Sequence, residues 1–124
     1  MKNFIHKLIY SIIFLLFISC NEFQKLLRNE DIKVKYEMAE KYYENEEWRR
    51  ASTLFEQIQP QYRGKPQGER ITFFYANSLL NRKNYVLAAF QFESFVKSYP
   101  ISQKVEEAAF LGAYCYYKQS PRHS

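Results

Sequence analysis

The chain has 124 residues, 47% of them hydrophobic, and a formal net charge of +5 at pH 7, so it has room for one small domain. Positive and negative side chains are interleaved, as in "EKYYENEEWRR" (residues 40–50), and no basic run could follow a phosphate backbone, which argues against nucleic acid as a partner. Histidine occurs only at His6 and His123, and there is no glycine-rich phosphate loop, Cys/His metal set or activated serine. We therefore expect neither an enzyme nor a cofactor.

Residues 1–19 are predicted to be a signal peptide. Two lysines give a positive start, and the apolar run 8–18 that follows is shorter than the ~20 residues a spanning helix needs. The run ends in "FISC", where small Ser19 precedes Cys20. This resembles the lipobox of bacterial lipoproteins, in which the cysteine becomes the lipid-modified first residue, although Phe17 replaces the commoner aliphatic residue. The alternatives are an ordinary signal peptide with an incidental cysteine, or an uncleaved anchor.

The chain that would remain after cleavage begins at Cys20. Loss of two lysines lowers its formal charge from +5 to +3. With Cys20 acylated, Cys115 is the only thiol left, so no disulfide within the chain is expected and Cys115 should be buried as a small apolar residue. Residues 20–31 are mostly polar, and we expect a lipidated tether there with about one helical turn.

The rest of the chain is predicted to be all-α. Apolar residues recur at spacings of three and four, whereas no useful length alternates apolar and polar residues as a strand does. Pro60, the stretch "RGKPQG" and Pro100 interrupt the helical pattern. Five helices are expected, over residues 32–45, 48–58, 69–81, 85–98 and 103–118.

The pattern of these helices returns every 37 residues. Ala39 corresponds to Ala76 and Ala51 to Ala88, and Ala113 comes one period after Ala76. Because antiparallel helices approach closely only where side chains are short, these alanines are expected at helix crossings, with large residues such as Phe55 filling the space beside them. This alternation resembles the tetratricopeptide repeat of ~34 residues. An unrelated helical bundle with accidental self-similarity is the alternative.

The resemblance implies a solenoid of helical hairpins over residues 32–124. Two repeats are complete, 32–68 and 69–102, and residues 103–124 supply the first helix of a third. The next alanine of the series would fall at position 125, so the third helix is expected to face a missing partner, and we expect the chain to be a fragment.

In tetratricopeptide arrays the first helix of each pair lines the concave side. Helical spacing gives an expected outward face that is rich in aromatic residues, which suits an extended apolar peptide. The alternative is that the same residues pack against neighbouring repeats. The predicted groove residues are Tyr36, Glu40, Tyr43, Phe73, Asn77, Leu80, Phe110, Tyr114 and Tyr117.

Several motifs in order resemble the family of the outer-membrane protein assembly factor BamD. They are the lipobox "ISC", "NEFQKLLRN", "KYEMAEKYYENEEWRRASTLFEQI", "YRGKPQGE", "NYVLAAFQFESFVKSYP" and "EEAAFLGAYCYYKQSPR". The resemblance implies a lipid-anchored component of the β-barrel assembly machinery on the periplasmic face of the outer membrane. Its partners would be unfolded outer-membrane proteins, a BamA-like barrel subunit and other components of the machinery.

Family members carry more repeats than the two and a part found here. Because the amino-terminal repeats of the family are associated with unfolded substrates and the later ones with the barrel subunit, the resemblance implies that this chain retains the substrate side. The alternative is another envelope lipoprotein with tetratricopeptide repeats, either a cell-division or peptidoglycan coordinator or a SusD-like glycan binder.

Overall fold

The computed structural model describes residues 1–122, and His123 therefore lies outside the described residues. Six α-helices and one short 3-10 helix follow one another, and no strand occurs in residues 1–122. The chain divides into two compact units, the first over Met1–Asp31 and the second from Ile32 onwards. Each unit is described by itself.

The first unit is one continuous helix, α1 (Lys2–Arg28). The helix continues for two turns beyond Cys20, which is longer than the one turn expected there, and the lipidated tether itself stays a prediction. Residues 21–28 contain neither glycine nor proline, and nothing in them interrupts the helix begun by the apolar run. The helix ends at Asn29, whose backbone is extended and whose side-chain oxygen accepts a hydrogen bond of 2.8 Å from the Asp31 N–H.

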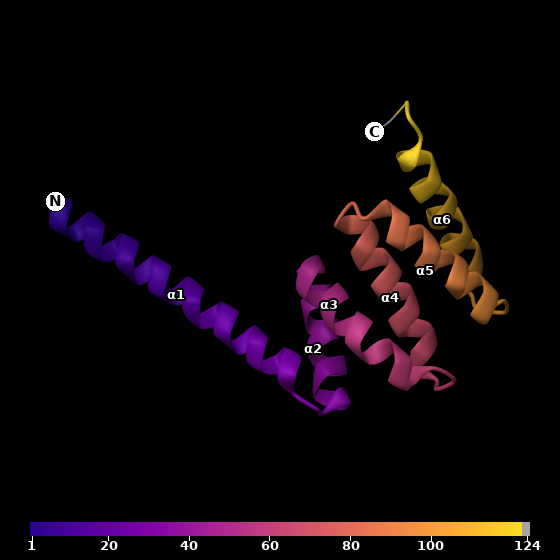
Figure 1. The fold of residues 1–124 in the computed structure, drawn as a ribbon, viewed down its shortest axis with the longest axis horizontal. Coiled ribbons are helices and arrows are strands. Elements are labelled where there is room, and N and C mark those ends of the chain that lie inside the picture. The colour runs from indigo at the N-terminus through magenta and orange to yellow at the C-terminus, as the bar shows by residue number, and fades with distance from the viewer. Residues whose placement is uncertain (123–124) are drawn as a thin grey trace. The chain divides into compact units, whose positions relative to one another are not determined.

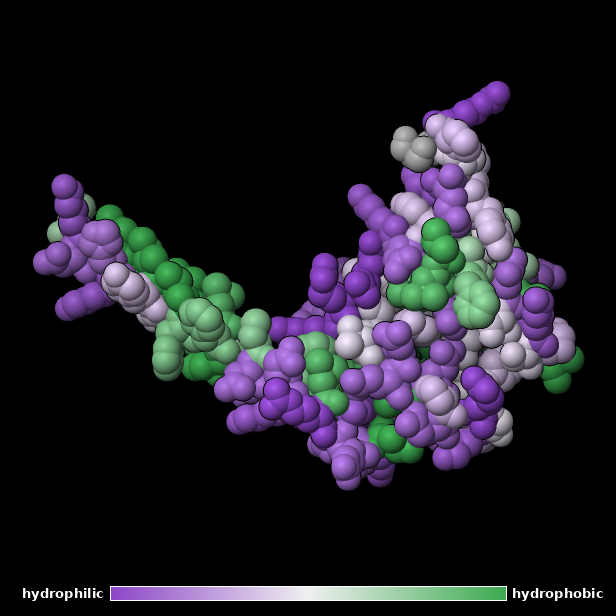
Figure 2. All heavy atoms as spheres, in the orientation of Figure 1, coloured by the Kyte–Doolittle hydropathy of each residue, from purple (hydrophilic) through white to green (hydrophobic). Residues whose placement is uncertain are grey.

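α1 exposes apolar side chains along its N-terminal part (Figure 2). Among residues 1–122 it is the one helix whose length and composition would allow it to cross a membrane. A signal sequence near an N-terminus has the same two properties.

The second unit contains the repeats. Each of its helices packs against the next along the chain, α2 on α3, α3 on α4, α4 on α5 and α5 on α6 (Figure 1). This confirms the predicted all-α class and the pairing of neighbouring helices, with helix ends within two residues of those expected. The elements are α2 (Ile32–Glu44), α3 (Trp48–Ile58), η1 (Gln59–Tyr62), α4 (Gln67–Asn81), α5 (Tyr85–Ser98) and α6 (Val105–Gln119).

Small residues lie in the core where the paired helices meet. Each alanine of the pairs Ala39–Ala51 and Ala76–Ala88 has no exposed surface, as the repeat pattern predicts. Ala113 differs, because it is exposed on α6. The buried residues of α6 are Ala108, Gly112 and Cys115, whereas Ala113 lines an open cavity together with residues of α5.

The turns inside the two complete repeats have the same backbone conformation. Glu46 has φ +59° and Lys83, which is 37 residues later, has φ +61°. In the first turn the Glu47 N–H donates to the Tyr42 carbonyl at 2.8 Å, and 37 residues on the Asn84 N–H donates to the Leu79 carbonyl at 2.9 Å. A left-handed residue closed by such a bond is a common helix C-terminal motif. The repeat is therefore present in the backbone as well as in the residue pattern.

The connection between the repeats folds back onto the start of α4. A Cβ atom added to Gly68 would lie 2.6 Å from the Tyr62 carbonyl oxygen and 2.8 Å from the Tyr99 hydroxyl. These distances are shorter than real carbon–oxygen contacts allow, so glycine permits the close approach of the loop, α4 and the end of α5.

Candidate functional site

The two cysteines differ in accessibility. Cys20 is exposed on α1, whereas Cys115 is fully buried between α6 and its neighbour. Burial also raises the pKa of the Cys115 thiol, because a thiolate is poorly solvated there. The prediction that Cys115 serves as a small core residue is confirmed. Attachment of lipid to Cys20 stays a prediction, and the exposed thiol is compatible with it.

Aromatic side chains of α2 and α4 meet on one face of the repeat unit. The rings of Tyr43 and Phe74 are stacked, with centroids 4.0 Å apart and planes 6° from parallel. Trp48 meets the edge of Tyr43 at 5.3 Å, and the Asn77 amide nitrogen donates to the Tyr43 hydroxyl at 2.7 Å. Burial raises the pKa of Tyr43, and the Asn77 hydrogen bond opposes this rise. These contacts hold Tyr43 in one orientation where α2 and α4, the first helices of the two repeats, meet.

A cluster of three polar side chains lies one to two helical turns away from this stack. The Tyr36 hydroxyl donates to Glu40 Oε1 at 2.7 Å, and Arg70 Nε lies 2.6 Å from the same oxygen. The guanidinium of Arg70 also lies over Phe74, 4.6 Å from the ring centroid. Burial and the Glu40 carboxylate raise the pKa of Tyr36 to about 12, so Tyr36 remains a neutral donor at physiological pH. Arg70 joins this cluster to the aromatic stack.

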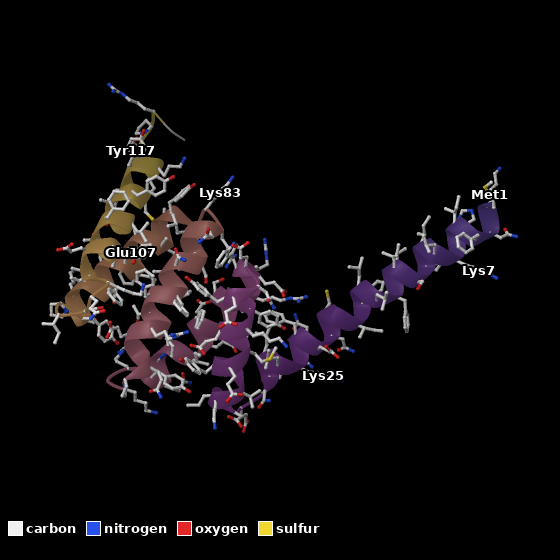
Figure 3. All side chains as sticks on the ribbon, turned by 180° about the vertical axis from the view of Figure 1, so that it is seen from behind. Met1, Lys7, Lys25, Lys83, Glu107 and Tyr117 are labelled. Carbon is white, nitrogen blue, oxygen red and sulfur yellow. The ribbon has the colours of Figure 1, made fainter. Side chains whose placement is uncertain are left out.

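A cavity of about 350 Å³ adjoins Arg70 and Phe74. Its cations are Arg70 and Lys104, and the ammonium of Lys104 lies 4.6 Å from the centroid of Phe73. Lys104 also forms an ion pair of 3.6 Å with Glu107, which projects from α6 (Figure 3). The cavity therefore combines aromatic walls with two cations and one carboxylate, that of Glu69. Its lining residues are Pro66, Glu69, Arg70, Phe73, Phe74 and Lys104.

Four of the predicted groove residues form direct contacts, one pair within a helix and one pair between two helices. Tyr36 contacts Glu40 within α2, and Tyr43 contacts Asn77 between α2 and α4. We use the name first-helix face for these four residues together with Arg70, Phe74, Phe110, Tyr114 and Tyr117, which come from α2, α4 and α6. Leu80 is half-buried on α4.

The α6 members of this set are more exposed than those of α2 and α4. Phe110, Tyr114 and Tyr117 have 69%, 39% and 54% of their surface exposed. The Tyr114 and Tyr117 rings lie near each other, with centroids 6.4 Å apart. Repeat spacing places these residues 74 positions after Tyr36, Glu40 and Tyr43, and their place on the first-helix face stays a prediction from that spacing.

Phe73 does not have the outward position that helical spacing predicted. It is 4% exposed, and its ring packs edge-on against Phe92 and Phe95 of α5. The reason is that α4 packs against both α3 and α5, so more of its circumference is buried than that of α2. The neighbouring Phe74 takes the place beside Tyr43. Sequence reasoning missed Phe74 and Arg70, although their spacing of four residues on one helix is typical of a cation–aromatic pair.

Comparison with known proteins identifies the family of this chain. Residues 28–124 match the family YfiO, described as outer membrane lipoprotein. No curated protein matches the chain. The match covers all of α2 to α6 and begins at the last residue of α1. The chain belongs to the YfiO family of outer membrane lipoproteins.

Proposed function

We propose that this protein is a lipid-anchored component of the outer-membrane β-barrel assembly machinery that binds extended segments of unfolded outer-membrane proteins on its first-helix face. The observation that carries the proposal is the Tyr43–Phe74 stack beside a cavity that contains Arg70 and Lys104. Membership of the outer membrane lipoprotein family and the exposed Cys20 support an anchor in the outer membrane, with the repeats on its periplasmic side.

The chemistry of this face suits a barrel strand before it folds. Such a strand is extended, and the side chains on one side recur at every second residue. Aromatic side chains of the strand would pack on Tyr43, Phe74 or the α6 tyrosines, and a terminal or side-chain carboxylate would pair with Arg70 or Lys104. Aromatic pairs contribute ~0.5–1.5 kcal/mol each beyond area burial, which favours weak and reversible capture. A substrate held in this way can be passed on to a barrel-forming subunit.

The partners of this function would be a BamA-like barrel subunit and other components of the assembly machinery. The full chain, purified from membranes, should co-purify with a membrane-embedded β-barrel protein. Recovery with cell-division or peptidoglycan proteins instead, or binding of glycans, would favour the alternative of another envelope scaffold.

Two adjacent tyrosines of α6 provide a matched test of the groove. Tyr117 and Tyr116 are 54% and 52% exposed, but Tyr117 belongs to the first-helix face whereas the Tyr116 hydroxyl donates to Glu93 of α5 at 2.7 Å. Tyr117→Ala should weaken binding of a carboxy-terminal barrel peptide about 2- to 12-fold, the equivalent of ~0.5–1.5 kcal/mol. Tyr116→Ala should leave the affinity unchanged. Equal affinities of both variants and the parent would exclude the first-helix face as the peptide site.

A further inference from the structure

The two cations of the cavity beside Phe74 are held in different ways. Lys104 Nζ lies 3.6 Å from Glu107 Oε2, three residues later in the chain, and both side chains are about half exposed. Such a surface pair restrains a lysine only loosely. Arg70 Nε lies 2.6 Å from Glu40 Oε1, and the Glu40 side chain belongs to the neighbouring repeat and is 24% exposed. Of the two cations, Arg70 therefore has the more fixed position.

Contacts on two sides hold the Arg70 guanidinium. The Glu40 oxygen that it approaches also accepts a hydrogen bond of 2.7 Å from the Tyr36 hydroxyl, which fixes the carboxylate in turn. The guanidinium also lies over the Phe74 ring, 4.6 Å from its centroid, and this ring is stacked on Tyr43. A planar guanidinium that is packed on a fixed ring and paired at one nitrogen keeps little rotational freedom.

The pair with Glu40 leaves several Arg70 donors for another partner. A guanidinium carries five N–H donors in one plane, which is more than one carboxylate can occupy. Arg70 has no second acidic partner within residues 1–122, and its side chain is 54% exposed where it lines the cavity. Two N–H groups of one guanidinium match the two oxygens of a carboxylate. Arg70 can therefore present a pair of oriented donors to a carboxylate that enters the cavity.

Net charge does not favour an anion at this site. The carboxylates of Glu40, Glu69 and Glu107 outnumber the two cations, and Glu69 lines the cavity itself. One Glu69 oxygen accepts a hydrogen bond from the Ser102 hydroxyl. An entering carboxylate must therefore be bound through oriented donors and not through a positive potential. This favours the fixed guanidinium over the loosely held lysine.

The three polar residues do not recur in the next repeat. One period of 37 residues replaces the hydroxyl, the carboxylate and the guanidinium by an apolar ring, an amide and a carboxylate. The equivalent positions of Tyr36, Glu40 and Arg70 are Phe73, Asn77 and Glu107. The repeat fold itself therefore does not require this arrangement.

We propose that Arg70 recognises a carboxylate of the bound segment and that Glu40 is the positioning residue that orients the guanidinium for it. This role rests on the proposed function, and it assigns the carboxylate to one of the two cations of the cavity. Arg70 contacts the ligand, whereas Glu40 acts through Arg70. Arg70→Lys keeps the positive charge but removes the planar pair of donors, so the two kinds of recognition can be told apart.

The test compares two peptides on the full chain in a nonionic detergent, acetyl-Thr-Tyr-Thr-Phe with a free terminal carboxyl and the same peptide as its amide. The ratio of their dissociation constants, measured by calorimetry, reports carboxylate recognition, since a loss of folded protein weakens both peptides equally. The parent should bind the acid about tenfold more tightly, which is near the lower end of what a charge-assisted hydrogen bond contributes. Arg70→Lys should lower this ratio to about twofold or less. Arg49→Lys, at an exposed arginine of α3, is the matched control and should keep the parent's ratio.

Two substitutions of Glu40 separate positioning from charge. Glu40→Gln and Glu40→Leu both remove the negative charge, but only Glu40→Gln keeps an oxygen that can accept from Arg70 and Tyr36. The ratio should therefore be higher in Glu40→Gln than in Glu40→Leu, by about threefold or more. Equal ratios in the two variants would overturn the positioning role of Glu40.

Further outcomes separate the role of Arg70 from the proposed function. If the parent binds acid and amide equally while Tyr117→Ala weakens both, the first-helix face binds peptide without recognising a carboxylate, and only the role of Arg70 is refuted. A ratio that is lost in Lys104→Met and kept in Arg70→Lys would assign the carboxylate to Lys104 and refute that role as well. If the parent binds neither peptide, the proposed function fails too.

Discussion

Leucine in place of Ala76 should destabilise the repeat unit, whereas leucine in place of Ala113 should not. The two alanines hold the same place in successive repeats, 37 residues apart. Ala76 has no exposed surface at the crossing of α4 and α5, whereas Ala113 is exposed on α6. Three further carbon atoms at a closed crossing force the helices apart or the leucine into a poor rotamer, at a cost of ~1–3 kcal/mol. At the exposed site the change should stay within ~0.5 kcal/mol.

Trp48 is the one tryptophan of the chain and lies in the repeat unit, so its fluorescence follows unfolding without a contribution from α1. Each kcal/mol should lower the midpoint of thermal unfolding by ~4–8 °C for a unit of this size. Urea unfolding of the full chain in detergent gives the free energy of unfolding independently. If Ala113→Leu costs as much as Ala76→Leu, or if Ala76→Leu costs nothing, the helix crossings are not where the alanines place them.

Four further outcomes are expected. Glu46→Gly and Lys83→Gly should each raise the free energy of unfolding in urea by about 0.5–1 kcal/mol, because glycine removes the strain of the left-handed backbone (~1–2 kcal/mol), which exceeds its entropic cost. A loss of stability in either variant would contradict the turn geometry. Gly68→Ala should cost ~1–3 kcal/mol, and an unchanged urea midpoint would show that the loop moves away freely. Burial, reinforced by the Glu56 carboxylate, raises the pKa of Tyr75 from 10.0 to about 12. The unfolded chain therefore loses this proton first, and the free energy of unfolding should fall from pH 10 to 12. Tyr75→Phe should flatten that decline, and an equally steep decline in the variant would refute the assignment. Cys20→Ala should abolish labelling by radioactive palmitate and release the protein from membranes, and labelling that persists would place the lipid elsewhere.

The fold could be predicted because small residues recur at a fixed distance. Ala39 and Ala76 are surrounded by the same pattern of large residues, and burial at a helix crossing leaves few alternatives to a short side chain. The left-handed turns could not be predicted, since Glu46 and Lys83 are not residues that favour that backbone. Their conformation follows from the closing hydrogen bonds and not from their side chains.

The candidate site could be predicted only in part. Spacing placed Tyr43 and Asn77 on one face, and the structure joins them. It could not separate Phe73 from Phe74, which are equally apolar neighbours, because the choice depends on how α4 is rotated between α3 and α5. The contact between Gln59 and Gln91 could not be foreseen either, since the two residues are 32 positions apart in the sequence.

The order in which the helices pack bears on how the chain acquires its structure. α3 packs on α2, α4 on α3, α5 on α4 and α6 on α5, so each helix finds its main partner in the segment just before it. Contacts between segments that are near each other in the sequence need only a short loop to form, which favours rapid folding. In arrays of this kind folding also spreads from one unit to the next. A chain that emerges amino-terminus first can therefore complete the α2–α3 hairpin before α6 is available, and each later helix is added to a template that already exists.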